Sequence, residues 1–440
     1  MVKYKSEGEK SKMKIFDIRE FGAIGDGKTL NTAAIQSAVN ACAEAGGQVL
    51  VSEGVYMTGA ITLKSNVDLH IDRNASLLGS PDCADYPEFE MKHVCAKRLP
   101  RSRGAALIFA EECENISISG MGKIDANGYS FVKECEPYHW GWKFKRLDLP
   151  TPPRVVFFTG CKNVLIKDVT MINQPAGWSY WIHDCDFVGF DRVKILADVE
   201  FPNNDGIHIN SSRNVTVSNS VISTGDDCIV VRANNVSLKE NKICEMVAIT
   251  NCTLTSHTNA IRIGWLNDGV IRNCVFSSIA ISNTRTGITV TLPSRPINEP
   301  LSDEGREDTL IENINFSNIT MDGIYLRPVQ IDIADSPITR CRAIRDIHFD
   351  GISASGIGFP YIAGRSNCHV KNIKFSNCDF RKLPPESLSY FFDPTAVKAQ
   401  EVGDNAFGAP KSELLNESEN LKIKHAENVV FENTSFSQGE

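Results

Sequence analysis

One short pattern recurs from about residue 110 to the end of the chain, and it constrains the fold more than any other feature. Each copy begins with Asn, continues as an alternating run of Val, Ile or Phe with polar residues, and then passes a polar pair into a second alternating run. Copies begin at Asn163, Asn214, Asn313, Asn372 and Asn428. The alternation predicts strands with one buried face, and Asn tolerates the left-handed backbone of a tight bend between them.

A single copy of this pattern is too short to enclose a core. Copies spaced by roughly 20 to 30 residues must stack, so that each buries its apolar face on the next, as in a solenoid. A β-sandwich also has many short strands, but it does not explain why one unit keeps returning. The pattern therefore predicts an all-β parallel β-helix that forms a single domain over residues 1–440.

Residues 14–80 are expected to form an N-terminal cap and the first coils. Asn31 and Thr32 can cap a helix that Gly46 and Gly47 end. Such a helix would shield the open strand edge of the first coil. Four apolar positions of the expected helix share one face: Ile35, Ala38, Val39 and Cys42.

Four segments depart from the repeating pattern. Residues 81–103, 134–154 and 292–308 are rich in turn-forming residues, and we expect long loops beside the solenoid there. Residues 383–419 are expected to form an irregular C-terminal insertion before the pattern resumes.

Charge and hydropathy exclude several classes of protein. The 46 Lys and Arg against 54 Asp and Glu give a net charge of −8, which argues against nucleic acid as a partner. No apolar run approaches the roughly 18 residues of a membrane span, so no membrane partner is expected. The first residues lack the apolar middle of a secretory signal. We therefore expect a cytoplasmic protein, or a secreted or periplasmic one if a signal peptide was removed.

The 14 cysteines form no CxxC motif, and several of them follow Asn within apolar, strand-like runs. We expect most of them to be buried free thiols, which also favours the cytoplasm. The spacing of ligands typical of zinc is missing, so neither a metal nor another cofactor is expected.

Two acidic motifs are separated by about one coil of the solenoid. Asp205 belongs to an Asn-Asp-Gly motif, and Asp226 and Asp227 belong to a Gly-Asp-Asp motif 21 residues later. Stacked coils would place Asp205 over Asp226 or Asp227, with strands ~4.8 Å apart. Such crowding raises the pKa of at least one carboxyl. One carboxyl can then stay protonated and act as an acid while another is ionised and acts as a base. Alone, each motif would be interpreted as a turn former.

These motifs resemble those of the polygalacturonase-like enzymes, glycoside hydrolase family 28. The resemblance also includes the Phe21 to Gly27 segment before the capping helix and the Pro153-Arg154 pair before the coils. It implies a right-handed parallel β-helix and an inverting hydrolase. By motif, Asp226 resembles the general acid, and Asp205 and Asp227 resemble the pair that holds the attacking water. Inversion requires carboxyl groups roughly 6.5–9.5 Å apart.

Three family features are missing from this chain. The Gly-His-Gly motif is replaced at residues 258–264, where Asn259 and His257 are the nearest substitutes for its histidine. The Arg-Ile-Lys clamp is replaced by an uncharged stretch at residues 287–291, and the family tyrosine is not evident near residues 331–333. The expected substrate is therefore a pectic or related plant polysaccharide or oligosaccharide other than plain polygalacturonan.

Aromatic and basic residues near the acidic motifs suit a carbohydrate substrate. All five tryptophans flank the motifs in sequence, and Trp178, Trp181 and Trp265 are candidates for stacking on sugars. Core packing is the alternative for the first two. Arg262 is expected to point outward, beside the site. His183 and His208 either support the site or are solvated.

Two other functions stay open on the sequence alone. A β-helix polysaccharide lyase would use the three Asp side chains to hold calcium, with an Arg or Lys as base. A non-catalytic carbohydrate-binding solenoid would keep the tryptophans without needing stacked acids.

Overall fold

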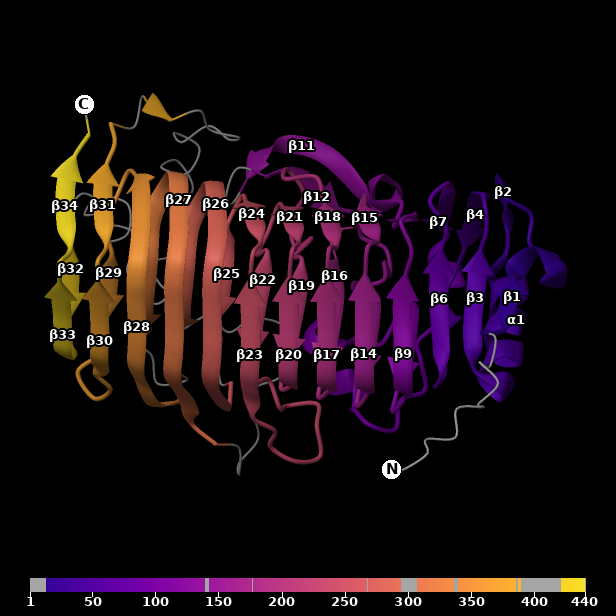
Figure 1. The fold of residues 1–440 in the computed structure, drawn as a ribbon, viewed down its shortest axis with the longest axis horizontal. Helices are drawn as coiled ribbons and strands as arrows, with labels where there is room; N and C mark the ends of the chain where they lie inside the picture. The colour runs from indigo at the N-terminus through magenta and orange to yellow at the C-terminus, as the bar shows by residue number, and fades with distance from the viewer. Residues whose placement is uncertain are drawn as a thin grey trace, which may run out of the picture.

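The chain winds into a solenoid of three-stranded coils, as the repeats predict. The computed structural model describes residues 13–138, 142–175, 177–266, 268–293, 307–335, 339–384, 387–388 and 421–439. Corresponding strands of successive coils pair in parallel, and they form three ladders that we name A, B and C in chain order. The ladders run along the long axis of the molecule (Figure 1). The parallel β-helix predicted from the sequence is therefore confirmed.

Each ladder takes one strand from each coil, and three long strands turn corners to join more than one ladder. Ladder A contains β1 (Ile15–Asp17), β3 (Gly47–Val51), β6 (Val67–Ile71), β9 (Glu114–Ser119), β14 (Lys162–Lys167), β17 (Asp186–Asp191), β20 (Arg213–Ser218), β23 (Cys244–Thr250), β30 (Val370–Ser376) and β33 (Ala426–Glu432). Ladder B contains β2 (Asp26–Leu30), β4 (Gly54–Thr58), β7 (Ala75–Gly79), β10 (Lys123–Asp125), β15 (Thr170–Ile172), β18 (Lys194–Leu196), β21 (Val221–Thr224), β24 (Thr253–Ser256), β31 (Asp379–Lys382) and β34 (Ser435–Gln438). Ladder C contains β5 (Ile61–Thr62), β8 (Ala106–Glu111), β13 (Arg154–Thr159), β16 (Trp178–His183), β19 (Ile207–Asn210), β22 (Ile229–Arg232), β25 (Asn259–Ile263), β29 (Tyr361–Ala363) and β32 (Lys422–Lys424). The long strands are β26 (Val270–Leu292), β27 (Thr309–Ile333) and β28 (Cys341–Gly356).

The recurring Asn residues make the bends, for the reason that the sequence suggests. Asn163 has φ 53° and Asn115 has φ 57°, both in the left-handed region. Their side chains also link successive coils, because the Asn163 amide donates to Asn115 Oδ1 at 2.7 Å and the Asn115 amide donates to Asn66 Oδ1 at 2.9 Å. One residue type thus supplies both the bend and a contact between coils.

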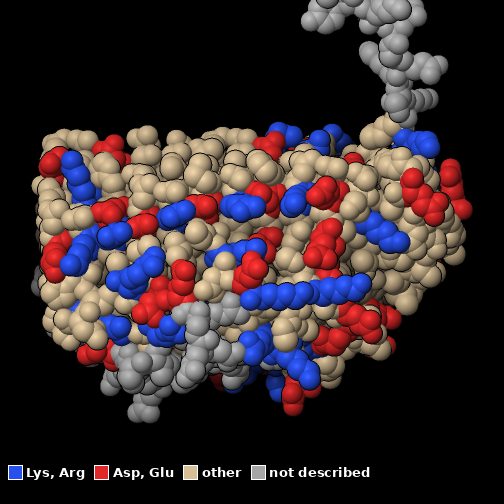
Figure 2. Space-filling model, turned by 90° about the horizontal axis from the view of Figure 1, so that it is seen from below, with Lys and Arg blue, Asp and Glu red and all other residues tan. Residues whose placement is uncertain are grey.

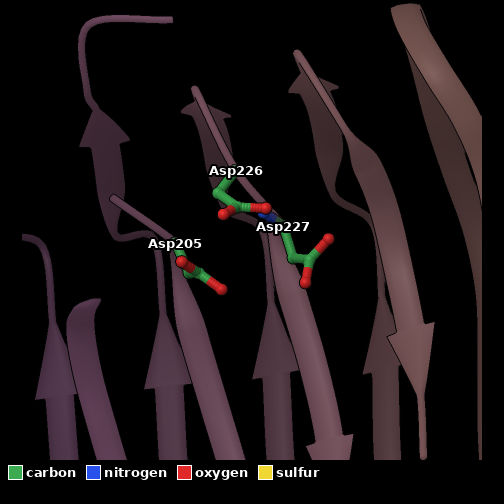
Figure 3. Close-up of side chains that lie close together, drawn as sticks. All are labelled: Asp205, Asp226 and Asp227. Carbon is green, nitrogen blue, oxygen red and sulfur yellow. The ribbon is translucent and has the colours of Figure 1, made fainter. Parts of the chain in front are cut away.

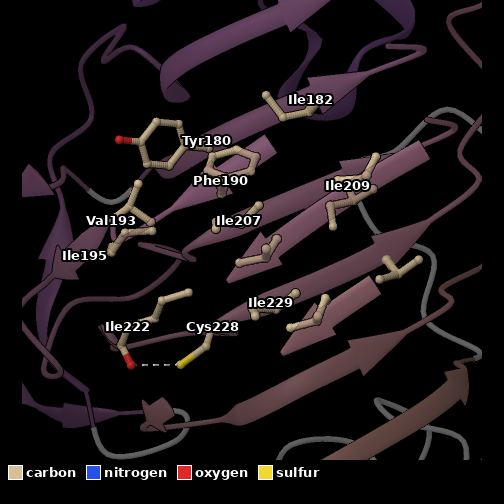
Figure 4. Packing of buried hydrophobic residues seen from close by; sticks show 14 of the residues in the cluster. Tyr180, Ile182, Phe190, Val193, Ile195, Ile207, Ile209, Ile222, Cys228 and Ile229 are labelled. Atoms are coloured by element: carbon tan, nitrogen blue, oxygen red, sulfur yellow. Dashed lines mark hydrogen bonds between the residues drawn. The ribbon is translucent and has the colours of Figure 1, made fainter. Parts of the chain in front are cut away.

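The core lies inside the coils, where alternate strand residues meet (Figure 4). In ladder A, phenylalanines of successive coils stack with ring centroids 4.6–5.0 Å apart. The stacked residues are Phe276, Phe316, Phe349, Phe375 and Phe431. Such offset aromatic pairs add to the free energy that burial of their area supplies. The alternation seen in the sequence is therefore the inward and outward alternation of the coil.

Charged side chains of opposite sign alternate along the outside of ladder A. Asp186 of β17, Arg213 of β20, Glu245 of β23 and Arg272 of β26 lie in register on four successive coils. Arg213 pairs with Asp186, and Arg272 pairs with Glu245. Figure 2 shows acidic and basic side chains interspersed in rows along the long axis on one face. Exposed pairs of this kind contribute little individually, but misaligned coils would juxtapose like charges.

A helix closes the N-terminal end of the solenoid. α1 (Thr32–Ala45) buries the four apolar residues that the sequence places on one face, and Gly46 ends it with φ 67°. Asn31 precedes the helix but makes no capping hydrogen bond, which corrects the expected role of its side chain. Its Oδ1 instead accepts from the Ile24 amide at 2.7 Å. A short 3-10 turn, η1 (Ile18–Phe21), precedes this helix.

The structure differs from the expected loops in one place. Residues 81–103 form irregular chain with η2 (Cys83–Asp85), η3 (Ala96–Arg98) and η4 (Pro100–Ser102). After η5 (Gly128–Phe131), residues 134–154 do not form a simple loop, because they contribute to an antiparallel hairpin of β11 (Val132–Tyr138) and β12 (Trp142–Arg146). The hairpin lies along the edge between ladders B and C (Figure 1). Residues 294–306 and most of 383–419, together with Trp140, lie outside the described residues.

The cysteines are largely buried, as expected, with Cys95 exposed and no disulfide between described residues. None of the helices in the described ranges has the length and apolar character that crossing a membrane requires.

Candidate active site

The three acidic residues meet at the corner between ladders B and C. Asp205 precedes β19 and the Asp226–Asp227 pair precedes β22. Ile207 pairs with Ile229, so Asp205 lies opposite Asp227 rather than Asp226 on the next coil. One carboxylate oxygen from each Asp lies within 4.8 Å of those of the other two (Figure 3). The sequence left the partner of Asp205 open, and the register of the coils decides it.

Asp227 is held in its ionised form. Its Oδ1 accepts from the Asn259 amide at 2.6 Å and lies 3.2 Å from Thr258 Oγ1, and its Oδ2 accepts from Arg262 Nε. Burial alone would raise the pKa of Asp227, but the Arg262 charge and these hydrogen bonds outweigh burial and lower it below its usual value. Thr289 Oγ1 donates to Asn259 Oδ1 at 2.7 Å, which turns the Asn259 amide nitrogen toward Asp227.

The pKa of Asp226 is shifted in the opposite direction, and Asp226 is the more accessible of the three carboxyls. It is partly exposed, whereas Asp205 and Asp227 are 2% and 3% exposed. Burial of the carboxyl and the negative charges of Asp205 and Asp227 raise the pKa of Asp226 well above its usual value. Thr258 Oγ1 donates to its Oδ1 at 2.8 Å and the Asn203 amide donates to its Oδ2 at 3.1 Å. Asp226 therefore carries a proton under conditions in which Asp227 does not.

Asp205 contacts His208 below the carboxylate cluster. Asp205 Oδ2 and His208 Nε2 are 2.9 Å apart, while Asp205 Oδ1 makes no hydrogen bond within the described structure. Burial, and then the charge of Asp227, raise the pKa of Asp205 to about 8. Burial also lowers the pKa of His208 well below its usual value, so this imidazole is neutral.

Trp178 and Trp181 do not offer open faces to a sugar. Trp181 is fully buried and Trp178 is 8% exposed. Their rings stack 4.6 Å apart, and the Trp181 ring lies 5.1 Å from that of His208. Both belong to a second apolar cluster that the 81–103 segment covers. This corrects the expected stacking role: the two rings support His208.

The other predicted residues divide between site and support. Arg262 contacts Asp227 and also lies 4.3 Å from the ring centroid of Trp265, which is partly exposed. His257 is fully buried and its Nδ1 contacts the Val199 carbonyl at 2.9 Å. His183 contacts the Asn234 carbonyl at 3.3 Å. Asn259 and Arg262 therefore join the cluster, whereas His257 and His183 contact backbone carbonyls.

Three residues of this site were not predicted from the sequence. Asn203 and Thr258 bind Asp226, and Thr258 lies in residues 258–264, the stretch that replaces the Gly-His-Gly motif. Arg285 lies at the same corner, because its neighbour Thr286 pairs with Asn259. Burial lowers the pKa of Arg285 to about 10, and the Asp227 and Asp226 charges oppose that shift. Arg285 could have been found from the sequence, because it is a basic residue two positions before the uncharged stretch at residues 287–291.

A proton donor and an ionised carboxylate thus share one corner, which is the requirement for acid–base hydrolysis. One oxygen of each carboxyl lies within 4.8 Å of the other, which is a distance between single oxygens; the roughly 6.5–9.5 Å expected of an inverting pair is measured between whole carboxyl groups. A cation could also bridge three carboxylates at this spacing. However, Asp227 is already paired with Arg262.

Comparison with known proteins identifies the family. The family model of the glycosyl hydrolases family 28 matches residues 88–385. The chain is 30% identical over 281 residues to the "Probable polygalacturonase" of Vitis vinifera, a match that covers 62% of this chain and 55% of the relative. It is 32% identical over 255 residues to the exo-poly-alpha-D-galacturonosidase of Dickeya chrysanthemi, covering 49% of this chain and 41% of the relative.

Among solved structures, an exopolygalacturonase from Thermotoga maritima superposes with a TM-score of 0.66. The two chains are 22% identical over 84% of this chain and 87% of the other. At that identity the likeness concerns the fold alone, and it agrees with a right-handed β-helix.

Proposed function

The chain belongs to family 28 of the glycosyl hydrolases, and from this premise we propose that it hydrolyses pectic galacturonan from one end of the polymer. One observation carries the proposal: adjacent carboxyls, Asp226 and Asp227, have pKa values shifted in opposite directions within a single cluster. Such a pair supplies the protonated acid and the ionised base that cleavage of a glycosidic bond requires.

In the proposed reaction, the protonated Asp226 donates its proton to the glycosidic oxygen as the C1–O bond breaks. A water molecule attacks C1 from the opposite face, and the Asp227 carboxylate accepts the proton that the water loses. Asp205 orients this water through its unbonded Oδ1 while His208 fixes its other oxygen. The product is a hemiacetal of inverted configuration, and the enzyme returns to its starting state when a proton passes from Asp227 to Asp226.

The proposed substrate differs from the one expected from the sequence. That expectation rested on the missing Arg-Ile-Lys clamp. Arg285 and Arg262 supply positive charge at the catalytic corner from other positions, which favours a substrate that carries carboxylates. The names of the Vitis and Dickeya relatives support galacturonan.

Action from the chain end is proposed from the 81–103 segment. It leaves ladder B and crosses the outside of ladder C, where Val94 and Leu99 pack against outward side chains of that ladder. On the far side the Cys95 amide donates to the Ser237 carbonyl at 2.8 Å. His93 contacts Asp184 there at 2.9 Å. A segment that spans the ladder next to the acidic corner would block one end of a bound polymer.

The test is digestion of polygalacturonan with product analysis by NMR. We expect galacturonate whose fresh product has the inverted anomeric configuration. A retained configuration would mean that an Asp forms a covalent intermediate and would overturn the assigned roles. An unsaturated product, together with activity that a chelator removes and calcium restores, would favour the lyase. Binding of oligosaccharide without turnover would favour the non-catalytic solenoid.

A further inference from the structure

Arg101 has an unusual backbone conformation beside the acidic corner. It lies in η4, inside the segment that crosses ladder C, and its φ of 65° and ψ of 11° are left-handed. This conformation is unfavourable for a residue with a Cβ, and it persists only where the surroundings impose it.

Arg154 fixes the backbone on both sides of Arg101. Its side chain is fully buried, and it donates to the Pro100 carbonyl at 2.9 Å and to the Arg103 carbonyl at 2.8 Å. Arg103 is itself fixed, because its Nε donates to Glu88 at 2.6 Å. A buried guanidinium thus holds the two carbonyls that flank Arg101 and imposes the turn.

The Arg101 guanidinium lies next to the catalytic cluster. Its Cζ is 5.0 Å from the centroid of the Trp178 ring, and that ring is 4.7 Å from the ring of His208. His208 in turn contacts Asp205 at 2.9 Å. Unlike Arg262 and Arg285, which are each 7% exposed, Arg101 is partly exposed. Burial, and then the charge of Arg146, lower the pKa of Arg101 to about 10, and the Asp205 and Asp226 charges oppose that shift, so Arg101 remains cationic.

We propose that Arg101 binds the carboxylate of the terminal uronate of the substrate. A guanidinium matches a carboxylate with two parallel hydrogen bonds, and the crossing segment presents it where a chain end would stop. The inference rests on the proposed function, since it names the group by which the site selects an acidic chain end. Arg101 would then take over, from an inserted segment, part of the role of the missing basic clamp.

The test measures binding separately from turnover. In an Asp226→Asn background, the Kd for trigalacturonate is compared between Arg101 and Arg101→Gln proteins by calorimetry. We expect binding to weaken roughly 10- to 100-fold, the usual range for a hydrogen-bonded charged group. The Kd for the neutral methyl-esterified trimer should stay unchanged, and Arg101→Lys should recover part of the loss. Lys97→Gln, which removes an exposed charge from the same segment, is the matched control and should bind like the parent.

Equal weakening for the acid and its methyl ester would mean that Arg101 only supports the fold, and it would overturn the proposal. An unchanged Kd for the acid, or no binding of the acid by the parent, would also overturn it. These results are distinguishable from failure of the proposed function, because that is decided by whether the unmodified enzyme hydrolyses galacturonan. A thermal melt of each variant confirms that it is folded.

Discussion

Asp226 and Asp227 are adjacent in the chain, yet one holds a proton and the other does not. The difference arises from their partners, because Arg262 contacts Asp227 while Asp226 faces two acids. The charges that lie next to each carboxyl, rather than the residue type, therefore make Asp226 the proton donor and Asp227 the base.

Replacing the acid tests this assignment. Asp226→Asn should lower kcat about 10²–10⁴-fold, because a general acid acts mainly in the transition state. KM should change little, since Asn keeps an oxygen that accepts from Thr258. Steady-state kinetics on polygalacturonan check this, and a kcat within threefold of the unmodified enzyme would exclude Asp226 as the acid.

The pH dependence of kcat/KM should form a bell. Its acidic limb follows protonation of Asp227, whose lowered pKa lies below 3.8, and its alkaline limb follows loss of the raised-pKa proton on Asp226. Arg262→Gln removes the charge that keeps Asp227 ionised, so burial then raises its pKa. The acidic limb should move to higher pH. A limb that stays in place would show that another group is the base.

Another buried acid, Asp332, makes the stability of the fold depend on pH. Asp332 is 1% exposed, its Oδ1 accepts from Gln330 at 3.0 Å, and burial raises its pKa to about 7. A raised folded-state pKa contributes stability at pH below 3.8, and this contribution is lost as the pH rises to about 7.

Asp332→Asn should remove this contribution and flatten the dependence of stability on pH. A pKa rise from 3.8 to about 7 corresponds to up to ~4 kcal/mol, so the variant should be more stable than the parent at pH 7. Chemical unfolding at pH 4 and pH 7 checks it. Asp335→Asn, at an exposed position nearby, should leave the pH dependence unchanged. A parent whose stability does not fall over this range would contradict the prediction.

At the scale of the element, the coil depends on its left-handed corner residues. Asn163→Ala should lower the free energy of unfolding by about 1–2 kcal/mol, because alanine resists φ of 53°. Asn163→Gly should cost less, since glycine adopts this φ without strain. Urea unfolding compares the two variants. Equal losses would show that the amide contact with Asn115, rather than the backbone conformation, is what stabilises the corner.

The elements also show why the sequence predicts some features and misses others. Strand alternation and corner asparagines repeat, so the coils could be predicted from them. The spacing of the acidic motifs predicted that Asp205 meets the Asp226–Asp227 pair, and only the register shows that its partner is Asp227. The β11–β12 hairpin has no such repeat, and its pairing register shifts between Glu134 and Tyr138, a stretch that contains Pro137. Arg101 and Arg285 lie at a crossing segment and a corner, where neighbours come from distant parts of the chain. Their positions follow from packing, which spacing along the sequence does not reveal.

At the scale of the whole molecule, the crossing segment should determine how the polymer is cut. With one end of the outer face of ladder C covered, we expect galacturonate to be released while the viscosity of a polygalacturonan solution falls slowly. Viscometry together with reducing-sugar measurement checks this, and an enzyme that cuts internally serves as the reference. A rapid fall in viscosity at low conversion would contradict action from the end.

The pairing of Asp205 and Asp227 on successive coils also has an evolutionary consequence. Each coil advances the chain by one strand spacing, ~4.8 Å, along the solenoid axis, so the axial distance between two residues is a multiple of this spacing. Inserting a whole coil between the two residues would separate them by one further strand spacing, and no smaller change is available. Segments at the corners, by contrast, can lengthen without changing the spacing between coils. Substrate preference can therefore diverge through insertions at the corners while the distance between the reacting groups is inherited unchanged.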